Sequence, residues 1–253
     1  MGRGSRDAVP GTSGNARIAP GFPRSGSSCP RSGRRAGRRG YGAAMPTSDQ
    51  VTTLGPDGAP GVLLLHPWWG VTPAVRWWAD ELAGGGRRVV LPDLFGGATP
   101  ATEEEAEALA DATLADPATA ALVARCADAL AAEGAPWAAM GFSLGAFLAC
   151  PLAGRGAAGP DELVLFYGGR PPAGADVRTR RVELHVAPGD PWFTDEELGE
   201  VSSGFRDVGA EVVVHRYEGC GHWFAEVGSP GHDAAATERA RQRVLVQLGA
   251  TAG

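Results

Sequence analysis

A single serine lies between two glycines in the stretch "GFSLG", residues 141–145, directly after an apolar run. This G-x-S-x-G spacing is that of a nucleophile elbow, a tight strand-to-helix turn that exposes a serine hydroxyl, and small residues on both sides keep the turn free of clashes. Glycine makes up 38 of the 253 residues, so the bare spacing also arises by chance. The apolar run before it and the helical segment "LGAFLAC" after it provide the context that the chemistry requires. We therefore predict that Ser143 is a nucleophile.

A serine nucleophile needs a general base, and the base needs an acid that orients it. Asp190 ends the stretch "RVELHVAPGD", so it follows an apolar run that is typical of a strand. His222 lies in "YEGCGHWF", directly after the next such run. The carboxyl ends of neighbouring parallel strands meet at one edge of a sheet. We therefore predict that Asp190 orients His222, which takes the proton of Ser143.

Other histidines and carboxylates fit these two roles less well. His185 and His215 lie inside predicted strands, where a satisfied core or face histidine is expected, and His232 lies in a glycine-rich turn without a strand before it. Asp195 and Glu196 are rivals for the acid, but they lie further from the strand end and are typical of the first turn of a helix.

Two backbone N–H groups are candidates for binding the oxyanion that forms during acyl transfer. One belongs to Leu144, which follows the predicted nucleophile directly. The second is expected in the loop "HPWWG", which follows an earlier predicted strand. Pro67 has no N–H in this loop. We therefore predict Trp68 as the second donor.

Several tryptophans lie close to the predicted catalytic residues in the sequence. Trp69 adjoins the second oxyanion donor and Trp223 follows the predicted base, so we expect both to line a substrate pocket. Trp77 and Trp78 lie on the helix that follows the first of these loops, where we expect core residues. Asp93, in "LPDLFGG", follows another strand and is expected to be structural.

The elements that must position these residues alternate along the chain. Short apolar runs bounded by turn residues predict strands at 61–66, 87–94, 137–142, 162–169, 181–190 and 211–219. Between them, capping residues and apolar stripes predict helices that begin after Thr72 and Asp116, follow Ser143 as far as Pro151, and cover 198–208 and 236–248. This alternation predicts one α/β domain with a mostly parallel sheet and helices on both faces.

Charge is distributed unevenly along the chain. Residues 1–44 contain nine arginines and one aspartate, about +8, so the remainder carries about −14 of the net −6. This leader has almost no large apolar residues, and we predict that it is disordered and that the folded domain covers 45–253. We favour the interpretation that Met45 is the first residue of the native protein and that the leader is a translated upstream stretch; a nucleic-acid tail and a targeting segment are the alternatives. The acidic body argues against nucleic acid or an anionic membrane as its partner.

The four cysteines, at positions 29, 126, 150 and 220, form neither a CxxC pair nor a dense framework. Such spacing favours free thiols in a reducing compartment, and we predict a cytoplasmic protein. No apolar run has the length of a membrane span. Nothing in the sequence separates a monomer from a homodimer.

Together these segments resemble the dienelactone hydrolase family of the α/β-hydrolase fold. The similarity covers about residues 61–248 and rests on "LLLHPWWGVTP", "LPDLFGG", "GFSLGAFLA", "FYGG", "HVAPGD" and "YEGCGHWF", in that order. The resemblance implies a triad of Ser143, Asp190 and His222 in the chain order of that fold. It also implies a compact enzyme that cleaves ester or lactone bonds without a metal or organic cofactor.

The chain departs from the family pattern at four positions. Well-studied members carry a cysteine where this chain has Ser143, and a glutamate that contacts it where this chain has Pro67. Members that cleave dienelactone bind its carboxylate with two arginines. This chain has Gly96-Gly97 at one of these positions and Glu226 at the other. The departures predict a serine-type enzyme whose pocket includes Glu226 and whose small substrate is neutral.

Two other functions remain compatible with the sequence. A non-catalytic binding protein could use the same fold, because fold does not determine function. A dehalogenase fits less well, because that chemistry normally uses an aspartate at the elbow.

Overall fold

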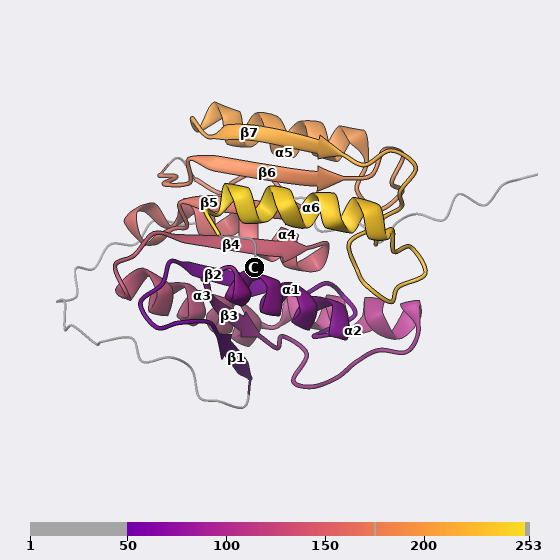
Figure 1. Ribbon diagram of the computed structural model, residues 1–253, viewed down its shortest axis with the longest axis horizontal. Coiled ribbons are helices and arrows are strands. Elements are labelled where there is room, and N and C mark those ends of the chain that lie inside the picture. The colour runs from indigo at the N-terminus through magenta and orange to yellow at the C-terminus, as the bar shows by residue number, and fades with distance from the viewer. Residues whose placement is uncertain (1–49, 175, 251–253) are drawn as a thin grey trace, which may run out of the picture. The chain divides into compact units, whose positions relative to one another are not determined.

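The computed structural model describes residues 50–174 and 176–250, and the predicted leader lies outside this range. Their sheet has seven strands in the order β1-β3-β2-β4-β5-β6-β7, of which only β1 is antiparallel to its neighbour (Figure 1). The mostly parallel sheet and the single α/β domain are therefore confirmed. The strands are β1 (Val51–Leu54), β2 (Gly61–Leu65), β3 (Arg88–Pro92), β4 (Trp137–Phe142), β5 (Glu162–Phe166), β6 (Arg181–Val186) and β7 (Glu211–Arg216).

Helices cover both faces of this sheet. Helices α1 and α6 pack on one face, and α3, α4 and α5 pack on the other (Figure 1). Pro151 follows α4 closely, and a 3₁₀ segment, η1, continues from its end, as the proline predicts. The helical elements are α1 (Pro73–Gly84), α2 (Glu103–Ala115), α3 (Pro117–Ala132), α4 (Leu144–Ala149), η1 (Cys150–Ala158), α5 (Asp195–Asp207) and α6 (Ala234–Gln247).

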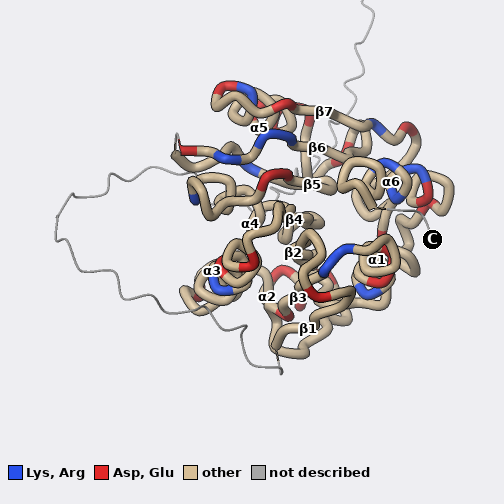
Figure 2. Tube along the Cα trace, turned by 60° about the vertical axis from the view of Figure 1, so that its left-hand side comes forward, with Lys and Arg blue, Asp and Glu red and all other residues tan. Residues whose placement is uncertain are grey.

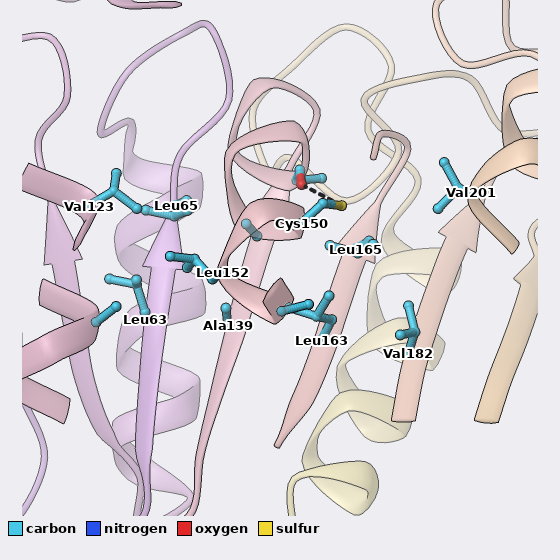
Figure 3. Packing of buried hydrophobic residues seen from close by; sticks show 14 of the residues in the cluster. Leu63, Leu65, Val123, Ala139, Cys150, Leu152, Leu163, Leu165, Val182 and Val201 are labelled. Atoms are coloured by element: carbon cyan, nitrogen blue, oxygen red, sulfur yellow. Dashed lines mark hydrogen bonds between the residues drawn. The ribbon is translucent and has the colours of Figure 1, made fainter. Parts of the chain in front are cut away.

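The central strands β2 and β4 are buried along their whole length and carry no charged side chain (Figure 2). Their side chains alternate between two hydrophobic clusters, one under each helical layer. Figure 3 shows the cluster beneath α3, α4 and α5, in which Leu63 and Leu65 of β2 pack beside Ala139 of β4 and Leu163 of β5. This packing on both faces gives the carboxyl ends of the central strands a rigid position.

Besides η1, one helix and one strand were not predicted from the sequence. Helix α2 buries only Ala106, Ala110 and Thr113, so it has no stripe of large apolar residues. Strand β1 has four residues, and all of them are at least partly exposed. No helix among the described residues is long and apolar enough to cross a membrane. Three of the cysteines lie in the described part of the chain, and all three have free thiols.

Candidate active site

Ser143 forms the turn between β4 and α4. Its backbone has φ 48° and ψ −110°, a left-handed conformation that is costly for a residue with a side chain. Close packing enforces the turn: a Cβ atom at Gly141 would overlap the backbone of Gly145, and one at Gly145 would overlap the carbonyl oxygen of Leu65. The N–H of Ser143 also donates to the carbonyl oxygen of Phe166 at 2.9 Å. The strain at the serine is therefore held by two glycines and by the neighbouring strands.

His222 lies in the loop that follows β7, and its Nε2 atom is 3.0 Å from Oγ of Ser143. Two contacts hold this loop. The indole N–H of Trp78 in α1 donates to the carbonyl oxygen of Ala225 at 3.0 Å, and the hydroxyl of Thr237 in α6 donates to that of Phe224 at 2.8 Å. Helices α1 and α6, which cover the same face of the sheet, therefore hold the loop that carries the imidazole.

Asp190 lies in the loop after β6 and is buried. Its Oδ2 atom is 2.6 Å from Nδ1 of His222. Its Oδ1 atom accepts from the backbone N–H groups of Trp192 and Phe193, at 2.8 and 3.3 Å. Because the carboxylate is held on both sides, the imidazole can keep its proton on Nδ1 and present the lone pair of Nε2 to Ser143.

The two predicted oxyanion donors come from the start of α4 and from the loop after β2, and the start of α4 packs against the carbonyl oxygens of Leu65 and His66 at the end of that strand. Leu144 is the first residue of α4, so its N–H has no acceptor within the helix. The loop with Trp68 is anchored by His66, whose Nδ1 lies 2.7 Å from the carbonyl oxygen of Pro67 and whose Nε2 accepts from the N–H of Leu94 at 3.0 Å. Burial lowers the pKa of His66, so this histidine is neutral and structural.

Four tryptophans gather beside the imidazole. Trp68 and Trp69 come from the loop after β2, Trp223 adjoins His222, and ring centroids within this group are 5.1–6.3 Å apart. The fourth, Trp192, has its ring centroid 6.3 Å from that of His222. The sequence analysis missed Trp192, although its position two residues after Asp190 was a usable signal.

Glu226 occupies a different environment from the one expected. It is 3% exposed, and its Oε1 atom accepts a hydrogen bond of 2.9 Å from the hydroxyl of Tyr167. The Tyr167 ring in turn contacts His222, with centroids 4.8 Å apart. Burial raises the pKa of Glu226 to about 8, so the carboxyl group is mostly protonated at neutral pH. Glu226 therefore adds little negative charge at this position, because desolvation disfavours the ionised form.

The structure also gives the rival residues other roles. Asp195 and Glu196 begin α5, as expected, and Asp195 pairs with Arg216. His185 and His215 both contact Glu183, away from Ser143. Asp93 accepts from the N–H groups of residues 95 and 97, which makes it structural, as predicted.

Comparisons with known proteins place the chain among hydrolases of one family. A family model described as "Dienelactone hydrolase family" matches residues 50–251. The chain is also 30% identical over 236 residues to carboxymethylenebutenolidase 1 of Cupriavidus pinatubonensis, a match that covers 85% of this chain and 93% of the relative.

Solved structures share the fold at lower sequence identity. A dienelactone hydrolase-like promiscuous phosphotriesterase from metagenomic libraries is 22% identical with a TM-score of 0.62, and the match covers 79% of this chain and 98% of that one. A phospholipase/carboxylesterase from Dyadobacter fermentans is 19% identical with a TM-score of 0.54, over 80% of this chain and 99% of that one.

Proposed function

Since this chain belongs to the dienelactone hydrolase family and is a hydrolase of carboxylic ester or lactone bonds, we propose that it acts through an acyl-enzyme intermediate on Ser143. The observation that supports this most strongly is the position of one imidazole between two partners. His222 has Nε2 at 3.0 Å from the Ser143 hydroxyl and Nδ1 at 2.6 Å from the Asp190 carboxylate. The hydrogen bond between Nδ1 and Asp190 orients the imidazole so that Nε2 can act as the base.

The proposed reaction has two halves. In the first, His222 takes the proton from Ser143 while Oγ attacks the carbonyl carbon, and the imidazolium then gives this proton to the leaving alcohol oxygen. In the second, His222 takes a proton from water while the water oxygen attacks the acyl carbon, and the imidazolium then returns this proton to Oγ of Ser143 as the acid is released. Asp190 stabilises the imidazolium in both halves, and the N–H groups of Leu144 and Trp68 bind the oxyanion.

We further propose that the substrate is small and neutral. The loop after β3 has Gly96 and Gly97 where family members that bind a carboxylate have an arginine, and the second arginine position is the buried Glu226. The indole N–H groups of Trp68 and Trp223 are buried without an acceptor among the described residues. Because an unpaired buried donor costs free energy, an ester oxygen bound beside these indoles would relieve that cost.

A cytoplasmic location is part of the same proposal. The free thiols of Cys126, Cys150 and Cys220 fit a reducing compartment.

Steady-state kinetics on short neutral aryl esters test the proposed triad. Ser143→Ala and His222→Ala should each lower kcat by at least about 10⁴-fold, with circular dichroism spectra and Tm close to those of the wild type. Ser203→Ala is a matched control, because Ser203 is an exposed serine of α5 whose hydroxyl donates to a carbonyl oxygen of its own helix. A triad variant with near-wild-type turnover would remove that residue from the mechanism.

A further inference from the structure

A second cluster of histidine and carboxylate groups lies on the outer strands of the sheet. Strands β6 and β7 carry charged side chains, whereas β2 and β4 carry none (Figure 2). Glu183 and His185 of β6 and His215 of β7 meet on the face that α6 covers. Their ligand atoms all lie within 4.8 Å of one another. The proposed hydrolysis uses none of these three side chains.

Strand geometry brings the three groups together. Residues i and i+2 of a strand point to the same face, so Glu183 and His185 project side by side. His215 lies directly opposite His185 in the register of β6 and β7. The Oε2 atom of Glu183 is 3.1 Å from Nε2 of His215 and 3.6 Å from Nε2 of His185. Ligand atoms of a tetrahedral zinc site are roughly 3.4 Å apart, as bonds of about 2.0–2.1 Å require.

One of these ligand atoms lies beyond hydrogen-bond distance of its neighbours. Nε2 of His185 is buried and makes no hydrogen bond among the described residues, although the residue is 0% exposed. Its other ring nitrogen lies 2.8 Å from the hydroxyl oxygen of Tyr217. When Nδ1 donates to that oxygen, the lone pair of Nε2 faces Glu183 and His215, which is the tautomer of a metal ligand.

We propose that Glu183, His185 and His215 bind one zinc ion. The set of two imidazole nitrogens and one carboxylate oxygen suits Zn²⁺, and three protein ligands leave a fourth position for water. The side chain of His215 is 19% exposed, so solvent reaches the cluster from its side of the sheet. The ion would tie β7, the edge strand, to β6 and would stabilise the folded state by an amount that grows with the logarithm of the free zinc concentration above the dissociation constant.

Neighbouring charges set the strength of this site. Arg181 donates to Oε1 of Glu183 at 2.8 Å, which leaves Oε2 for the ion. Arg243 of α6 lies over the Tyr217 ring, 5.3 Å from its centroid. Both guanidinium groups repel a divalent cation, so we expect weaker binding than at closed four-ligand structural sites.

Calorimetric titration of the full chain with zinc chloride tests the proposal. The protein carries no polyhistidine tag and is freed of metal with a chelator that is then removed. We expect one equivalent of zinc to bind the wild type, and His215→Gln and Glu183→Gln to weaken binding by at least about 10-fold. Visible absorption of the cobalt-loaded protein should show the same loss. If Glu183→Gln fails to fold, His215→Gln still tests the proposal, because the His215 side chain is partly exposed and its replacement should leave the fold intact.

Two matched controls separate this site from other histidines. His232→Gln removes a half-exposed histidine outside the cluster, and His222→Gln removes zinc binding to the proposed triad. Both should keep the wild-type zinc affinity. The proposal is overturned if the wild type binds no zinc, if His215→Gln binds zinc as tightly as the wild type, or if His222→Gln alone loses the ion.

Discussion

Nε2 of His222 lies 3.0 Å from Oγ of Ser143, although 79 positions separate the two residues in the chain. The contact joins the loop after β7 to the turn after β4. Its direction is set by Asp190, because the hydrogen bond at Nδ1 determines which nitrogen faces the serine. The reactivity of Ser143 therefore depends on how precisely three loops are held in place. Substitutions of the residues that hold these loops should change it.

Gly145→Ala should disrupt the serine turn. The new Cβ atom would overlap the carbonyl oxygen of Leu65, so the start of α4 must shift away from β2. We expect both a loss of several kcal/mol in the free energy of unfolding and a severe loss of kcat/KM, measured by urea denaturation and by ester hydrolysis. Gly199→Ala in α5 meets no atom within 4 Å and should be neutral or stabilising by up to about 1 kcal/mol. Equal effects of the two variants would contradict this account.

Glu226→Gln should change how stability depends on pH. Burial raises the pKa of Glu226 from the ordinary 4.5 to about 8, so the unfolded chain loses this proton at a lower pH than the folded one. The group therefore stabilises the fold fully below about pH 4.5, and this contribution is lost as pH rises toward 8. The amide cannot ionise, so the variant should gain roughly 1.4 kcal/mol per pH unit relative to wild type across that window.

Unfolding free energies measured in urea at several pH values check this slope. Glu200→Gln, at an exposed position of α5, is the control and should leave the slope unchanged. A pH-independent difference between Glu226→Gln and the wild type would mean that Glu226 is ionised in the folded protein.

Trp78→Phe should loosen the loop that carries His222. The phenyl ring keeps most of the buried contact but loses the indole donor to the carbonyl oxygen of Ala225. Leaving that acceptor unpaired costs about 1–3 kcal/mol, and we expect kcat to fall as well because the imidazole is held less well. Trp77→Phe, on the half-buried neighbour, is the control. Thermal unfolding and kcat should change more in Trp78→Phe than in this control.

Substrate charge provides a test of the pocket. Gly96-Gly97 and Glu226, at the positions where dienelactone-cleaving family members have arginines, offer no cation. The loss of a charge-assisted hydrogen bond costs roughly 1.5–3 kcal/mol. A carboxylate-bearing aryl ester should therefore have a kcat/KM at least about 10²-fold below that of a neutral analogue of similar size. If the anionic ester is preferred, Arg170 is the first residue to replace, because it follows Gly168, which packs against the backbone of Ser143, and its guanidinium lies 4.2 Å from the ring centroid of Phe147 in α4.

The sequence predicted the parallel strands and the order of the three proposed catalytic residues because both depend on local patterns. Buried parallel strands such as β2 and β4 are apolar throughout, and a glycine on each side of Ser143 marks the turn. Helix α2 had a usable signal in Thr102 and Glu105, where the threonine hydroxyl accepts from the N–H of Glu105. Apolar periodicity missed this helix because its buried face is mostly alanine.

The contacts that hold the site in place could not be predicted from the sequence, because they join segments that are far apart in the chain. Burial raises the pKa of Glu226, and the hydrogen bond from the hydroxyl of Tyr167, which is 59 residues away, acts in the opposite direction. The role of His66 depends on the N–H of Leu94, which comes from another loop. Local patterns carry no information on either contact.

The most direct test of the central claim is the site of covalent labelling by a neutral fluorophosphonate ester, read by peptide mass spectrometry. The account predicts one adduct per chain, on Ser143, because within residues 50–174 and 176–250 this is the hydroxyl that is hydrogen-bonded to His222. The adduct should be absent in Ser143→Ala and should form at least about 10²-fold more slowly in His222→Ala. An adduct on another residue, or labelling of Ser143 at an unchanged rate without His222, would contradict it.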